Sequence, residues 1–135
     1  MKNQDKINKM LQAADNALIS HKIVKGGTVE DGYDSAIAAF GPTVVMSGLM
    51  PSLAFYCAEG KDDSRKTNKS IVIDAIATML FSKYNKKDHK ELLKFCIEKN
   101  NDNKAFLSKL TEDIVNASVA LKIMVRTYKI MKDDE

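Results

Sequence analysis

The sequence has few of the side chains that enzyme and metal sites require. Its 135 residues include two histidines and two cysteines. His21 and His89 stand alone, and neither Cys57 nor Cys96 has a possible metal ligand at a useful spacing. The sequence also lacks a glycine-rich phosphate loop, a nucleophile elbow and a paired-histidine motif. We therefore expect no catalytic residue, no metal site and no cofactor.

The histidines and cysteines that are present have simple structural explanations. We expect His21 to pack near the end of the first helix, and His89 to lie on the surface in the first turn of a later helix. Both cysteines lie among apolar residues, and no basic-then-apolar leader precedes them. This pattern favours buried free thiols in a reduced, cytoplasmic protein.

Long apolar runs are also missing. The longest are far shorter than the roughly 20 residues that span a bilayer, so we expect no membrane segment. The composition is instead that of an ordinary globular protein, with 44% apolar and 29% charged residues. We predict a single helical domain over residues 1–135. The net charge of +3 permits binding to a polyanion but does not require it.

Apolar residues recur at helical spacing along most of the chain, and no segment has a convincing strand pattern. The fold class predicted from this periodicity is all-α, a compact bundle of about six helices. The apolar stripes cover residues 7–24, 33–40, 43–56, 72–84, 92–97 and 107–131.

Glycine and proline predict where the second and third helices end and begin. We expect Gly41-Pro42 to close the second helix and Thr43 to cap the third. Pro51 lacks the N–H that would bond to the carbonyl of residue 47, so the chain should kink or restart just after Gly48.

Polar residues predict the starts of the last two helices. Asp88, followed three residues later by Glu91, has the pattern of a capping box. Asp102 or Asn103 can cap the last and longest helix.

The order of residues between Tyr33 and Phe55 is more specific than the composition. It reads Tyr33-Asp34-Ser35, then Pro42, then Gly48-Leu49-Met50-Pro51-Ser52-Leu53-Ala54-Phe55. This order resembles the small subunit of the Cmr complex, the type III-B CRISPR RNA-guided effector. In that family a tyrosine-led short helix precedes a proline and then a helix with Gly-Leu, three variable residues and Leu-Ala-Phe. The resemblance covers most of the chain.

The resemblance implies a non-catalytic subunit that stacks in multiple copies beside the RNA-bearing backbone of the complex. Its implied partners are the backbone and large polymerase-like subunits, further copies of itself, and guide and target RNA. Contact with the guide–target duplex would be made mainly through positive charge. Three alternatives stay open: the small subunit of the related type III-A complex, a small helical DNA-binding regulator, and a helical protein-interaction adaptor.

Basic residues that could contact an RNA backbone form clusters. Two of these are in the central loop and on one outer face of the last helix. The first contains Lys61, Arg65, Lys66 and Lys69, and the second contains Lys122, Arg126 and Lys129. A third cluster, near Tyr84, contains Lys83, Lys86, Lys87 and Lys90. Phosphate contacts do not read bases, so we expect binding without sequence preference.

The last helix has apolar residues outside its main heptad seam. Val119, Ile123 and Ile130 form this second flank. A helix that is apolar on two sides has two neighbours. The second neighbour is either another helix of the same bundle or, as the resemblance favours, another subunit.

Overall fold

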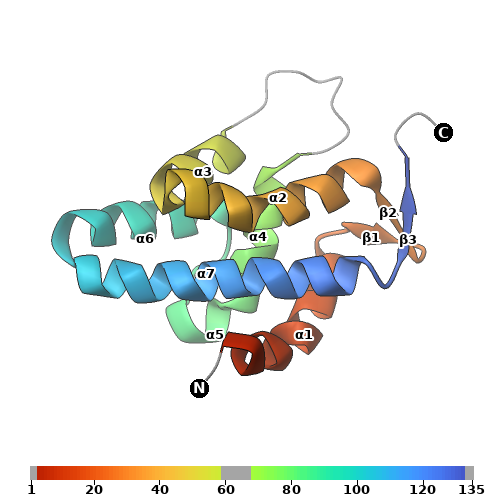
Figure 1. Cartoon of the computed structure of the whole chain (residues 1–135), viewed down its shortest axis with the longest axis horizontal. Coiled ribbons are helices and arrows are strands. Elements are labelled where there is room, and N and C mark those ends of the chain that lie inside the picture. Colours follow the sequence, from red (N-terminus) through yellow and green to blue (C-terminus); the bar gives the residue numbers. More distant parts are fainter. Residues whose placement is uncertain (1–2, 59–67, 133–135) are drawn as a thin grey trace.

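The computed structural model describes residues 3–58 and 68–132. Within these residues the chain forms seven helices and a small sheet (Figure 1). The helices are α1 (Asn3–Ser20), α2 (Asp31–Ser47), α3 (Leu49–Cys57), α4 (Ser70–Met79), α5 (Phe81–Tyr84), α6 (His89–Asp102) and α7 (Lys104–Val125). The strands are β1 (Val24–Lys25), β2 (Thr28–Glu30) and β3 (Lys129–Met131). The all-α class is confirmed, and the short strands are an addition that the sequence pattern did not predict.

Helix α7 lies across the middle of the molecule and organises its core. It packs between α1 and α2, and it also contacts α4 and α6 (Figure 1). Four residues of its predicted apolar seam are fully buried, Leu110, Ile114, Ala117 and Leu121, whereas Leu107, Met124 and Tyr128 are only partly buried and Met131 is 40% exposed on β3. Contacts with several neighbouring helices therefore fix the position of α7.

Helix α2 does not end at Gly41-Pro42, so that prediction is wrong. Pro42 lies inside the helix with its side chain exposed, and Thr43 donates its hydroxyl to the Ala39 carbonyl at 2.7 Å instead of capping a new helix. Gly41 is buried, and a Cβ there would lie 3.6 Å from Ser118 Oγ of α7. The packing energy of α2 against α7 thus outweighs the loss of the backbone hydrogen bond that Pro42 cannot donate.

A new helix begins after Gly48, as the position of Pro51 in the sequence predicted. Gly48 has φ 90° and ψ 163°, a conformation that essentially only glycine adopts. Helix α3 begins at Leu49, which places Pro51 in its first turn. Proline is tolerated there because the first N–H groups of a helix have no intrahelical acceptor.

The predicted fourth helix is divided in two, which raises the number of helices. At Leu80 the backbone leaves helical values, with φ −99° and ψ 9°, and α5 follows as a single turn. Leu80 is only 4% exposed, so the break keeps this side chain in the core.

The first and the last helix both end earlier than predicted, because the residues that follow each of them pair as strands. Val24 and Val29 face each other across the antiparallel β1–β2 pair, and Ile130 aligns with Val29 in the parallel β2–β3 pair. Helix α7 therefore ends at Val125 and does not continue to residue 131. Strand pairing satisfies backbone groups and leaves Val29 only 1% exposed.

The predicted starts of the last two helices are confirmed. Asp88 Oδ1 accepts a hydrogen bond from the Glu91 backbone N–H at 2.9 Å, and Glu91 Oε1 accepts from the Lys87 backbone N–H at 2.8 Å. Asn103 Oδ1 accepts from the Phe106 N–H at 3.0 Å. These caps fix the corner between α5 and α6 and the entry into α7.

Candidate nucleic-acid interface

The basic residues near the end of α7 do not share one helix face. Lys122 lies in the last turn of α7, Arg126 follows as its C-cap residue, and Lys129 lies on β3. Arg126 Nε lies 3.4 Å from Asp34 Oδ1, in the first turn of α2. The Arg126 side chain is nevertheless 52% exposed, so part of the guanidinium faces solvent. We call Lys122, Arg126 and Lys129 the basic end of α7.

The central-loop residues Lys61, Arg65 and Lys66 lie outside the described residues. Their predicted contact with RNA remains a prediction.

The residues of the predicted second apolar flank, like the basic residues, lie on two different elements. Ile123 is 44% exposed on α7, and Val119 lies one turn earlier and is half-buried. Ile130 lies on β3, partly buried, so it belongs to the sheet and not to the helix flank. The exposed apolar surface of α7 is therefore narrower than the sequence pattern suggested.

A larger exposed apolar surface lies where α2 meets α3. Val45 is 80% exposed, Met46 85% and Phe55 61%. The Lys69 ammonium lies 4.5 Å from the centre of the Phe55 ring, which is a cation–π contact. The spacing of Val45 with Leu49 and Leu53 suggested one apolar face, but the turn at Gly48 sends Val45 to the surface and the two leucines to the core.

The third basic cluster lies beside three aromatic rings that make edge-to-face or tilted contacts. Tyr84, Phe95 and Phe106 come from α5, α6 and α7, and their ring centres lie 5.7 to 6.0 Å apart. Lysine ammonium groups lie over these rings: Lys86 is 4.8 Å from the Phe95 centre and Lys99 is 4.9 Å from the Phe106 centre. Only the tertiary structure brings the two phenylalanines to Tyr84, because they lie on different helices.

A buried carboxylate ties this cluster to α7. Asp113 is 3% exposed, accepts a hydrogen bond from the Tyr84 hydroxyl at 2.5 Å and lies 2.8 Å from Lys83 Nζ. Burial raises the pKa of Asp113, but Lys83 and Tyr84 outweigh burial and hold this pKa below its usual value. Burial and the bond to Asp113 raise the pKa of Tyr84.

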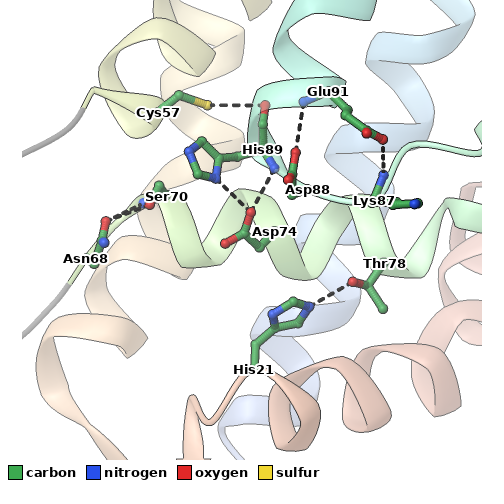
Figure 2. A network of polar contacts seen from close by, with 10 residues as sticks. All are labelled: His21, Cys57, Asn68, Ser70, Asp74, Thr78, Lys87, Asp88, His89 and Glu91. Carbon is green, nitrogen blue, oxygen red and sulfur yellow. Dashed lines mark hydrogen bonds and ion pairs between the residues drawn. The ribbon is translucent and has the colours of Figure 1, made fainter.

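A second polar network joins α4 to the start of α6 (Figure 2). Asp74 Oδ1 accepts from the His89 backbone N–H and lies 2.7 Å from ring Nδ1 of His89. His89 is thus held against α4, so the prediction that it is a surface residue is wrong. His21 packs at the end of α1, where its Nε2 lies 2.7 Å from Thr78 Oγ1 (Figure 2).

The two cysteines are free and buried, as predicted. The Cys57 thiol contacts the backbone carbonyl of His89 at 4.0 Å (Figure 2). Burial raises the pKa of each thiol to about 12, which keeps both protonated at neutral pH. A protonated, enclosed thiol is a poor nucleophile and a poor metal ligand.

The described ranges 3–58 and 68–132 contain neither a metal-binding cluster nor a membrane-spanning helix. These residues contain no group of three or more histidine, cysteine or acidic side chains that could hold a metal ion. No helix among them is both long enough and apolar enough to cross a membrane.

The fold and these surfaces define a small helical protein that presents basic and apolar side chains on a rigid core. A model of the family described as CRISPR-associated protein (Cas_Cmr5) matches residues 3–128. The chain therefore belongs to this family, the small subunit of the type III-B CRISPR effector, which confirms the resemblance. This is a family of small non-catalytic subunits that associate with other CRISPR effector subunits. No curated protein and no solved structure gives a significant match.

Proposed function

We propose that this chain, acting as a single domain, stacks in multiple copies beside the RNA-bearing backbone of the Cmr complex and contacts the guide–target RNA duplex without reading its sequence. The family match over residues 3–128 carries the proposal. The basic end of α7 supports it, because Lys122 and Arg126 stand on a fixed helix end with Arg126 half exposed. Phosphate contact needs positive charge but no base-specific group.

The RNA contact can be tested by neutralising the two helix-borne cations. We expect Lys122→Gln with Arg126→Gln to weaken binding to any RNA duplex and to reduce the salt dependence of log K by about one unit per residue. Asp34→Asn is the matched control, because it releases Arg126 from its ion pair and leaves both cations in place. This control should bind at least as tightly as the wild-type protein.

The measurement is a titration of two unrelated RNA duplexes at several salt concentrations. A strong preference for one duplex, or binding by the double variant that equals wild type, would contradict the proposed contact.

Stacking can be tested at the exposed apolar residue of α7. Identical subunits arranged along a linear RNA need two different surfaces per copy, and such contacts strengthen when RNA and backbone subunits hold the copies together. We expect Ile123→Glu to leave the melting temperature nearly unchanged, because this side chain is 44% exposed, but to reduce incorporation into the complex in a pull-down. Ser108→Glu, at an exposed position on the same helix, is the control and should be incorporated normally. An Ile123→Glu protein that both folds and assembles would exclude this residue from the subunit interface.

A further inference from the structure

A groove opens at the corner between α5 and α6, and none of its lining residues belongs to the basic end of α7. Its volume is about 400 Å³, within the range of roughly 300–1,000 Å³ that is typical of small-ligand sites. The lining residues are Asn85, Lys86, Lys87, Glu91, Lys94, Phe95 and Glu98. The groove thus combines one aromatic ring with three cations and two carboxylates.

The three lysines of the groove are available to an anion. No hydrogen-bonded or ion-paired carboxylate partner occurs for Lys86, Lys87 or Lys94 in the part of the chain that the structure describes. Glu91, in contrast, is already engaged, because its carboxylate accepts the Lys87 backbone N–H. With three lysines and two glutamates, the groove carries a formal net charge of +1.

The aromatic ring of the groove is held at a fixed position and orientation. Phe95 packs edge to face on Phe106, with 5.7 Å between ring centres, and also contacts Tyr84 at 5.9 Å. The capping box of α6 and the Asp74 bonds to His89 hold the start of this helix (Figure 2). Lys86 Nζ lies over the Phe95 ring, 4.8 Å from its centre, and Lys99 Nζ lies 5.6 Å from the same centre, so a base that stacks on this ring displaces a flexible lysine side chain.

These groups match the two parts of one nucleotide. A base can stack on the ring face that the Lys86 ammonium covers, and the displaced ammonium remains on a flexible side chain within reach of the adjoining phosphate. Glu98 can accept a hydrogen bond from an N–H on the Watson–Crick edge of a base, such as N3–H of uracil. A paired base cannot stack in this way, because its faces are covered by its neighbours in the duplex.

We propose that the α5–α6 groove binds an unpaired nucleotide of a single-stranded RNA, with the base on Phe95 and the phosphate on Lys86 and Lys94. This site is separate from the duplex contact proposed for Lys122 and Arg126, so each can fail without the other. The groove binds the strand through stacking and charge together, whereas the basic end of α7 acts through charge alone.

The test uses the full chain with three probes: a short oligouridylate strand, the same strand annealed to oligoadenylate, and uridine monophosphate. Phe95→Leu removes the stacking face but keeps an apolar side chain against Phe106. We expect it to weaken strand binding by about 5- to 150-fold, the range of one base stacked on an aromatic ring, and to leave duplex binding unchanged. Lys86→Gln with Lys94→Gln should lower the salt dependence of log K for the strand by about 1.4. Lys104→Gln, at an exposed lysine outside the groove, is the control. It should change the affinities for strand and duplex by no more than about a factor of two.

Strand binding by Phe95→Leu equal to wild type, or an equal loss of strand and duplex binding, would overturn the proposal. Binding of uridine monophosphate that depends on Phe95, without binding of the strand, would support the same chemistry and identify a free nucleotide as the ligand. A melting curve accompanies each variant. If Phe95→Leu unfolds, the lysine pair decides, because loss of strand binding with duplex binding intact supports the groove and unchanged strand binding refutes it.

Discussion

Three carboxylates link elements of this fold that are distant in sequence. Asp113 joins α5 to α7 through Tyr84 and Lys83, and Asp74 joins α4 to α6 through His89. Asp15 of α1 accepts the Tyr128 hydroxyl at 2.5 Å and ties the segment after α7 back to the first helix. A buried carboxylate is stable in such a place only because donors replace the water it has lost.

Asp113 should therefore contribute stability that depends on pH. Its folded-state pKa is below the unfolded value of about 3.9, so the ionised form stabilises the fold above that pH. This contribution is lost as the pH falls through the folded-state pKa. We expect Asp113→Asn to lower the free energy of unfolding at neutral pH by about 1–3 kcal/mol and to make it less dependent on pH in acid.

Denaturant unfolding between neutral and acid pH is the measurement for Asp113. The exposed Asp102, replaced by asparagine, is the control and should leave the neutral-pH stability nearly unchanged. If the wild-type and Asp113→Asn curves lose stability in parallel as the pH falls, Asp113 does not have this role.

At the scale of elements, Gly48 decides where α2 ends, whereas Gly41 lies where α2 packs against α7. Gly48 allows the sharp turn into α3, which exposes Val45 and Met46 and buries Leu49 and Leu53. Gly41 has ordinary helical geometry and instead sits against α7. The two glycines should thus respond in opposite ways to an added methyl group.

We expect Gly48→Ala to destabilise the protein by about 1–3 kcal/mol, because its conformation is nearly exclusive to glycine. The added Cβ would meet no atom closer than 3.8 Å, so the cost comes from the backbone and not from a clash. Gly41→Ala is the comparison: its Cβ would make ordinary contacts at 3.6 and 4.0 Å, and helix propensity should add up to about 1 kcal/mol. Thermal melts of both variants test this, and equal shifts in the same direction would show that the φ angle of Gly48 is not what matters.

At the scale of the whole molecule, the two histidines and the two cysteines make their contacts within the fold. The potentially reactive side chains serve structural roles: the two thiols are buried and protonated, His89 is bonded to Asp74, and His21 is bonded to Thr78. The described surface carries lysine, acidic and amide side chains, a half-exposed arginine and eight large apolar side chains that are exposed. Such a surface can bind and position partners.

We expect the purified chain to leave single-stranded and duplex RNA and DNA intact in the presence of magnesium or manganese. The reason is that the described residues contain no cluster that could hold a metal ion, and both thiols are buried and protonated. Gel analysis of end-labelled substrates is the measurement, with a mock purification as the control. Metal-dependent cleavage that co-purifies with the protein would contradict the expected inactivity.

Local signals in the sequence were enough to predict the helical class, the caps at Asp88 and Asn103, the restart after Gly48 and the family. They sufficed because caps, turns and apolar periodicity act between residues only a few positions apart. The family match rests on residue order and needs no coordinates.

The tertiary structure alone decided the remaining features. Helix α2 continues through Pro42 because α7 packs against Gly41, and α7 ends at Val125 because the following residues pair with β2. The rings of Tyr84, Phe95 and Phe106 meet because α5, α6 and α7 come together in the fold. In each case the deciding partner is distant in sequence, and its packing or pairing energy outweighs the local preference, which no pattern within one segment can reveal.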